Sequence, residues 1–287
     1  MGKNKLFFMA ICLLTLLSCK DGQGDKLLLN SIEQTWQLCE TSLPDAWAKA
    51  ETLKASVRLS SEYTKQKYDL LSIRLRDKME VVPSSPDSAL QTLSYFEGRK
   101  NPVDKERAYY YAGSAYRDLK DYPRAVSLFL KAADVAEQSR DADTLIWQNA
   151  LSQLRNLYML QLNYEEELNV ALQSVALAKQ TGKNLGCYLM DVASAYQHLN
   201  DTTQCLSHLD EAYRIIKDEH APARYGRILA AMLKAYSDFH HYDKVDSLLK
   251  IGMKPAQIAK VMDAKIQTVW NRVKRAEEIC GNMKSTQ

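Results

Sequence analysis

Glycine and proline are scarce in this sequence, at ten and seven among 287 residues. Both residues mark turns, so their scarcity argues against an architecture of strands and tight turns and against a glycine-rich phosphate-binding loop. Alanine, leucine, lysine, glutamine and glutamate, which favour helix, are frequent. With 46% apolar residues the chain can bury a continuous core, and its composition excludes disorder, collagen-like repetition and a small disulfide-stapled fold. We therefore predict an all-α protein.

Catalytic and metal-binding motifs are missing as well. The five histidines show no HExxH or other ligand spacing, and the sequence contains no GxSxG motif and no P-loop. The six cysteines are irregularly spaced, which fits neither a disulfide framework nor a zinc site. We expect no enzymatic activity, no cofactor and no metal.

The N-terminus holds the strongest apolar run of the chain. Lys3 and Lys5 precede a largely apolar run of 12 residues, 6–17, an order that is typical of a secretory signal. A membrane span needs about 20 residues, so this run is better explained as a cleaved signal. The residues that close it, Leu16-Leu17-Ser18-Cys19, resemble the lipobox of bacterial lipoproteins. The resemblance implies cleavage before Cys19, a diacylglycerol on its thiol and acylation of its amino group.

From this resemblance we predict a signal peptide over 1–18 and a polar tether over 19–26. Two or three acyl chains give stable anchoring without a membrane span. The body of the protein would then lie in the cell envelope, anchored by lipid to the inner or outer membrane and facing the periplasm or the cell surface.

A repeat runs through the body of the chain. Four tyrosines are spaced by 42, 38 and 40 residues, and each closes one amphipathic segment shortly before the next begins; they are Tyr116, Tyr158, Tyr196 and Tyr236. Residues 104–137 show the whole unit and resemble a tetratricopeptide repeat. The matching positions are Ala112, Gly113, Tyr116, Asp121, Tyr122, Ala125, Phe129 and Ala132.

The repeat pattern also predicts close packing. Two antiparallel helices can approach closely only where small residues face each other, so we expect Gly113 and Ala125 to form the contact of the best repeat. Cys205 takes the place of such a small residue in the third unit. In the second unit Glu167 stands where the pattern has alanine, so that unit is predicted to be degenerate.

These patterns predict a right-handed solenoid of antiparallel helix hairpins. We expect diverged helical repeats over 27–103, with helices near 44–56, 61–82 and 87–98, and regular repeats over 104–250. The resemblance places the first helix of each hairpin on a concave face that binds a protein or peptide. Its predicted groove residues are Arg107, Tyr110, Ser114, Arg117, Asn149, Asn156, Ser194, Gln197, Arg227 and Lys234.

The C-terminal segment differs in charge. Residues 250–287 carry eight lysines and arginines against three acids, a net charge of +5 within a chain whose total is +3. Residues 251–278 resemble the helix-turn-helix of sigma-factor region 4 and related regulators, followed by a tail over 279–287. The resemblance implies DNA contacts by Lys265, Gln267, Trp270, Asn271, Lys274 and Arg275.

Two functions follow from these segments. The first is a membrane-anchored envelope lipoprotein that acts as a non-enzymatic scaffold for protein-protein interaction, with the basic segment as a relic or a cap of the solenoid. The second is a repeat-sensor transcriptional regulator that binds DNA through the C-terminal segment. They conflict because an exported chain and the DNA lie on opposite sides of the inner membrane.

Overall fold

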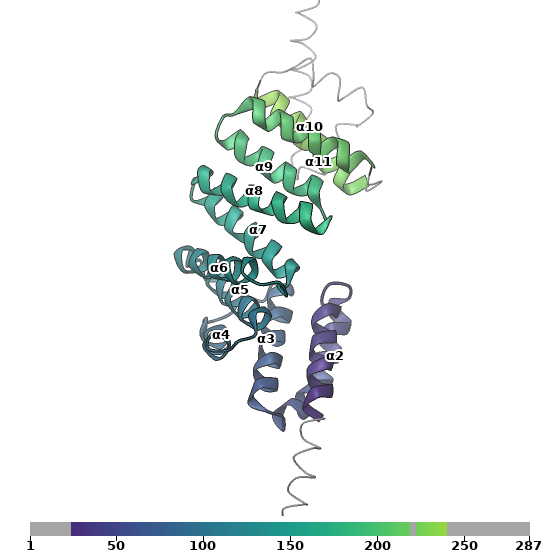
Figure 1. The fold of residues 1–287 in the computed structure, drawn as a ribbon, viewed down its shortest axis with the longest axis vertical. Helices are drawn as coiled ribbons and strands as arrows, with labels where there is room; N and C mark the ends of the chain where they lie inside the picture. Colours follow the sequence, from purple (N-terminus) through teal and green to yellow (C-terminus); the bar gives the residue numbers. More distant parts are fainter. Residues whose placement is uncertain (1–23, 219–221, 240–287) are drawn as a thin grey trace, which may run out of the picture. The chain divides into compact units, whose positions relative to one another are not determined.

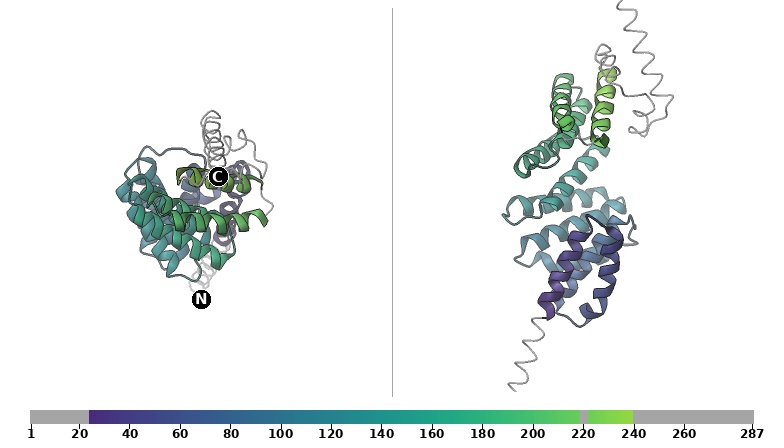
Figure 2. Two further views of the ribbon diagram at one scale, coloured as in Figure 1. Left: turned by 90° about the horizontal axis from the view of Figure 1, so that it is seen from above. Right: turned by 90° about the vertical axis from the view of Figure 1, so that its right-hand side faces the viewer.

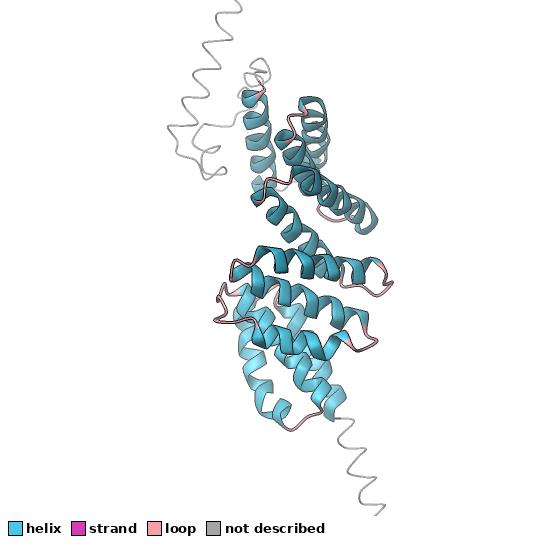
Figure 3. Ribbon diagram, turned by 90° about the vertical axis from the view of Figure 1, so that its left-hand side faces the viewer, coloured by secondary structure: helices cyan, strands magenta, loops and turns pink. Residues whose placement is uncertain are grey.

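The computed structural model describes residues 24–218 and 222–239. Within these residues every regular element is a helix and no strand occurs (Figure 3), which confirms the all-α class. The chain divides into two compact units, residues 1–150 and 151–287.

The first unit begins with a helix over residues 24–38. It continues with α2 (Leu43–Arg58), α3 (Glu62–Lys78), α4 (Asp87–Glu97), α5 (Pro102–Asp118), α6 (Tyr122–Glu137) and the start of α7 (Thr144–Leu160) (Figure 1). The three helices predicted upstream of the best repeat are present, although α3 ends four residues before its predicted end. It stops because Glu80 adopts a left-handed φ of 57° and the N–H of Val81 bonds back to the Arg76 carbonyl at 3.0 Å.

The second unit contains the end of α7 and then α8 (Tyr164–Thr181), α9 (Leu185–His198), α10 (Thr202–Asp218) and α11 (Pro222–Asp238). Each of α8 to α11 packs against the next along the chain, and α9 also contacts α11. In the right-hand view of Figure 2 the last two helices, drawn in green and yellow-green, lie next to each other. The first helices of neighbouring hairpins, α9 and α11, therefore form one layer.

The regularly spaced tyrosines mark a turn that recurs between the two helices of a hairpin. In three hairpins the residue just before the second helix donates its N–H to the carbonyl of the repeat tyrosine: Asp121 to Tyr116 at 2.9 Å, Asn163 to Tyr158 at 3.0 Å and Asp201 to Tyr196 at 2.9 Å. The residue before each is left-handed, with φ of 64°, 57° and 60° at Lys120, Leu162 and Asn200. The same three Asp and Asn side chains accept an N–H of the following first turn, a cap worth about 1 kcal/mol.

Close helix approach occurs at two glycines, one in each unit. A Cβ at Gly113 would lie 2.9 Å from the Phe129 ring, and one at Gly186 would lie 2.5 Å from Ile216. Ala125 is buried as predicted, but the atoms nearest to the Gly113 position belong to Phe129 rather than to Ala125. The repeat aromatic itself thus fills the space that the glycine leaves.

We expect Gly113→Ala to lower the free energy of unfolding by about 1–3 kcal/mol, because the fully buried Phe129 ring has little room to move. The sign of this change is informative, because replacing glycine by alanine in a helix normally raises the free energy of unfolding by up to about 1 kcal/mol. Gly98→Ala is the control, because nothing lies within 4 Å of its added methyl group. Chemical denaturation measures both variants, and a Gly113→Ala protein as stable as wild type would contradict the close approach.

Candidate protein-binding face

Arg107 is the most heavily bonded of the predicted groove residues. It lies on α5 with 4% of its surface exposed. Its two terminal nitrogens bond to the two Glu33 carboxylate oxygens at 2.8 and 2.9 Å, and it also pairs with Asp143 at 2.8 Å. Its guanidinium lies 4.0 Å from the centre of the Trp36 ring. Burial favours a neutral Glu33, but the bonds and charge of Arg107 prevail and lower the Glu33 pKa to about 2.

Further ion pairs surround this arginine. Arg74 of α3 also lies over Trp36, 4.1 Å from the ring centre, and pairs with Glu40. Asp104, which is 1% exposed, accepts bonds from Lys67 and from the Tyr63 hydroxyl, both at 2.6 Å. The α5 face is thus joined to α3 and to the helix over 24–38 by buried, mutually neutralised charges.

The other predicted groove residues of α5 are covered in the same way. Tyr110 is 5% exposed, with its ring against Tyr111 and Phe129, and Ser114 is 2% exposed. Arg117 is half-buried and pairs with Asp77 of α3 at 2.9 Å and with Asp118 at 2.7 Å. The prediction that these α5 side chains line an accessible groove is therefore wrong, because the upstream helices of the same chain occupy that face.

The equivalent face of the second unit is more open. Arg227 of α11 is exposed, and the side chain of Lys234 keeps 45% of its surface exposed. Ser194, Gln197 and Asn156 are half-buried. Gln197 of α9 donates to Asp238 of α11 at 2.8 Å, and Lys234 lies 3.8 Å from the same carboxylate. The α9 and α11 layer therefore presents predicted groove residues to solvent. Asn149, on the part of α7 that belongs to the first unit, is half-buried.

Two charged residues of this face were missed by the sequence reasoning. Asp191 of α9 lies 3.5 Å from Arg155 of α7. Burial raises the pKa of the Asp191 carboxyl, and the positive charges of Arg155 and Arg227 oppose that rise. Arg155 was overlooked because the repeat pattern assigned the neighbouring Asn156 to the groove, and Asp191 because the pattern assigned Ser194 and Gln197 of the same helix.

Glu167, which appeared to be a defect of the second repeat, is a buried anchor. It is 0% exposed, lies 2.8 Å from His198 Nδ1 and accepts a longer bond from Arg155 at 3.4 Å. The His198 ring also stacks on Tyr164 at 5.0 Å. A carboxylate here connects α7, α8 and α9, which the alanine of the usual pattern could not do. The small residue predicted at Cys205 is buried, at 1% exposure.

Glu106 is a second fully buried carboxyl, on α5. It accepts the backbone N–H of Asp143 at 3.0 Å, just before α7 begins. Burial raises its pKa to about 8, the nearby Asp143 charge adds to the rise and Arg107 opposes it. Glu106 therefore holds its proton at neutral pH.

Other predicted sites lie outside the described residues. They are the lipidation site Cys19 and the DNA contacts Lys265, Gln267, Trp270, Asn271, Lys274 and Arg275. Among the residues that the structure does describe, no helix is both long enough and apolar enough to cross a membrane.

No protein-family model and no curated protein match this chain. Solved structures do match its fold. A signal-transduction ATPase with a tetratricopeptide-repeat sensor from Pyrococcus horikoshii is 14% identical with a TM-score of 0.69, covering 90% of this chain and 41% of that one. The apo form of RapI is 11% identical with a TM-score of 0.59, covering 90% and 99%. NprR in complex with its cognate peptide NprX is 11% identical with a TM-score of 0.54, covering 88% of this chain and 78% of that one. These likenesses confirm a tetratricopeptide-like helical-repeat fold.

We expect Glu167→Ala, which restores the pattern residue of the repeat, to destabilise the protein by about 1–3 kcal/mol. The change leaves Arg155 and His198 without their shared carboxylate and opens a cavity in the core. Glu167→Gln keeps the volume and one acceptor, so it should lose less. Urea denaturation of the three proteins measures the difference; an alanine variant at least as stable as wild type would mean that Glu167 contributes nothing.

We expect Glu106 to make folding less favourable as the pH rises. Its pKa is about 8 when folded and near 4.5 when exposed, so between these values the unfolded state releases the proton first and stability falls. Glu106→Gln should remove this dependence. Unfolding free energies are measured for both proteins at pH 5 and at pH 8. From pH 5 to pH 8 the free energy of unfolding should fall by at least about 1 kcal/mol more in the wild type than in the variant. An equal fall in both proteins would show that Glu106 has an ordinary pKa.

Proposed function

We propose that this protein is a non-enzymatic scaffold that binds a protein or peptide segment along α9 and α11 of its second unit. The observation that carries the proposal is the contrast between the two first-helix faces. The α5 face is filled by the chain's own upstream helices, whereas Arg227 and Lys234 remain open to solvent. NprR, a protein of similar fold, was solved with a bound peptide.

The charges on this face favour a partner with acidic side chains. Arg155 is close to Asp191, and Lys234 lies near Asp238, so both cations have an acid of the same chain beside them. Arg227 is more exposed than either of them, and its positive charge also acts on Asp191. A partner carboxylate opposite Arg227 would add a charge-assisted hydrogen bond at the rim of the face, and arginine presents two donors to such a group.

The scaffold is proposed to act in the cell envelope as a lipoprotein. The support is the signal-like sequence over 1–18 and the lipobox-like residues that end at Cys19. The alternative, a transcriptional regulator, rests on the net charge of +5 over residues 250–287 and on the helix-turn-helix resemblance there. The two proposals require opposite compartments, which makes the compartment the decisive observation.

One experiment in living cells tests both the anchor and the binding face. Full-length protein and Cys19→Ala are labelled with a fatty-acid analogue and fractionated, and each carries a photo-crosslinking residue at position 227. We expect a labelled, membrane-bound wild-type protein, loss of the label in the variant, and a crosslinked adduct formed through position 227. The regulator would instead give an unlabelled, full-length chain in the cytoplasm that binds duplex DNA at low salt.

The matched control carries the crosslinker at Gln173, an exposed residue of α8, which is the second helix of its hairpin and lies outside the α9 and α11 layer. Lys234→Glu reverses the charge next to the crosslinker and should reduce the adduct several-fold if the partner is acidic. An adduct that forms equally from positions 173 and 227 would contradict the proposed face, and a lipid label that persists in Cys19→Ala would contradict the anchor.

A further inference from the structure

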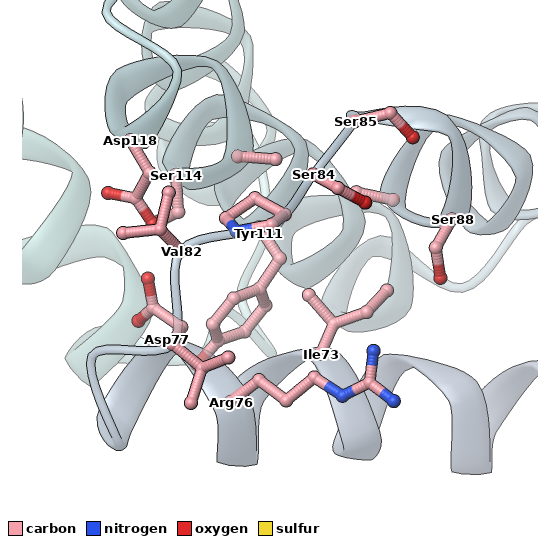
Figure 4. Close-up of a pocket in the computed structure, with 14 residues that line it drawn as sticks. Ile73, Arg76, Asp77, Val82, Ser84, Ser85, Ser88, Tyr111, Ser114 and Asp118 are labelled. Carbon is pink, nitrogen blue, oxygen red and sulfur yellow. The ribbon is translucent and has the colours of Figure 1, made fainter.

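A cavity in the first unit lies apart from the proposed binding face. Its volume is about 310 Å³, near the lower end of the range for small-ligand sites. It is enclosed by the end of α3, the extended residues 81–85, the start of α4 and one side of α5 (Figure 4). Because all of these segments belong to one unit, the cavity is formed within a single packed body.

One side of the cavity is apolar. Ile73, Tyr111 and Ala115 line it. Val82, which keeps 65% of its surface exposed, lies nearer to Asp77 and Asp118 in Figure 4. Tyr111 and Ala115 are buried in the α5 packing, so this side is held firmly in place. Such a surface suits a short hydrocarbon chain.

The opposite side carries two carboxylates that share one cation. Arg117 bonds to Oδ1 of Asp77 at 2.9 Å and to Oδ1 of Asp118 at 2.7 Å, which leaves the second oxygen of each carboxylate for another donor. Two acids and one guanidinium retain one negative charge. Arg76, the cation among the lining residues, is exposed and lies in solvent rather than with this group.

Ser114 supplies an independent sign of a missing partner. It is 2% exposed and lines the cavity. Among the described residues its Oγ makes no hydrogen bond of normal geometry, although the hydroxyl is close enough to the Asp77 carboxyl to favour its ionised form. A buried hydroxyl without a well-formed hydrogen bond is unfavourable, so such groups usually mark a bound molecule or water. Figure 4 shows Ser114 on the same side of the cavity as Asp77 and Asp118, with Ile73 facing them.

We propose that this cavity binds a primary ammonium group carried on a short apolar chain. An ammonium has three N–H donors, and Asp77, Asp118 and Ser114 offer one acceptor each. Its charge neutralises the surplus negative charge, while its hydrocarbon stem lies against Ile73 and Tyr111. Such a group can come from a free small amine or from a lysine side chain of a partner protein.

Calorimetric titration of the full-length protein with n-pentylammonium tests the proposal. Pentan-1-ol is the neutral probe of similar shape and should bind at least about tenfold more weakly. A lysine residue blocked at both ends separates the two sources: binding comparable to pentylammonium supports a partner lysine, and its failure beside a binding pentylammonium supports a free amine. Equal binding of pentylammonium and pentan-1-ol, or binding of neither, would overturn the proposal.

Variants locate the bound ammonium. Asp118→Asn keeps an oxygen for Arg117 but removes a charge, so it should weaken pentylammonium about tenfold or more. Asp134→Asn removes the same charge from an exposed position on α6, outside the cavity, and should change nothing. Val82→Lys adds a tethered ammonium at the exposed mouth and should block the probe even if Asp118→Asn proves unstable. Binding that survives Val82→Lys, or that falls equally in Asp134→Asn, would refute the site.

Discussion

The buried guanidinium of Arg107 is the interaction on which the first unit depends. It bonds to Glu33, 74 residues earlier, and to Asp143, 36 residues later, while its flat face covers Trp36. A buried charge is tolerated only when it is paired and hydrogen-bonded, so the helix over 24–38, α5 and the start of α7 must reach their positions together. Two neighbouring ion pairs, Arg74 with Glu40 and Lys67 with Asp104, neutralise further charges close to Arg107.

This constraint decides which surface remains for a partner. In a helical repeat the first helices of the hairpins form one face, and any segment that covers this face removes it from binding. The diverged upstream helices do so for α5, using charged pairs together with apolar contacts such as that of Trp36 with Tyr111. The face of α9 and α11 has a similar row of charges, Arg155, Asp191 and Arg227, but Arg227 is exposed. The proposed binding function therefore belongs to the second unit.

Deviations from the repeat pattern are where this chain carries its own chemistry. Glu167 replaces an alanine and connects three helices through His198 and Arg155. Glu106 is buried and protonated, so that it accepts a backbone bond beside α7 without adding a charge. Among the described residues Ser114 makes no hydrogen bond of normal geometry where α3 and residues 81–85 pass α5, and a cavity forms there. A pattern describes the packing shared by all repeats, and these residues serve contacts that only one repeat makes.

The sequence by itself determined the helices, the hairpin turns and the buried small residues. These features are local: helical periodicity, an Asp or Asn cap and a spaced tyrosine act within a few residues of one another. Only the tertiary structure decided which groove residues are accessible, because Arg107, Tyr110 and Ser114 are covered by segments distant in the chain. Burial of a polar side chain depends on long-range ion pairs, such as those of Arg107 with Glu33 and Arg117 with Asp77, and no local pattern encodes those pairings.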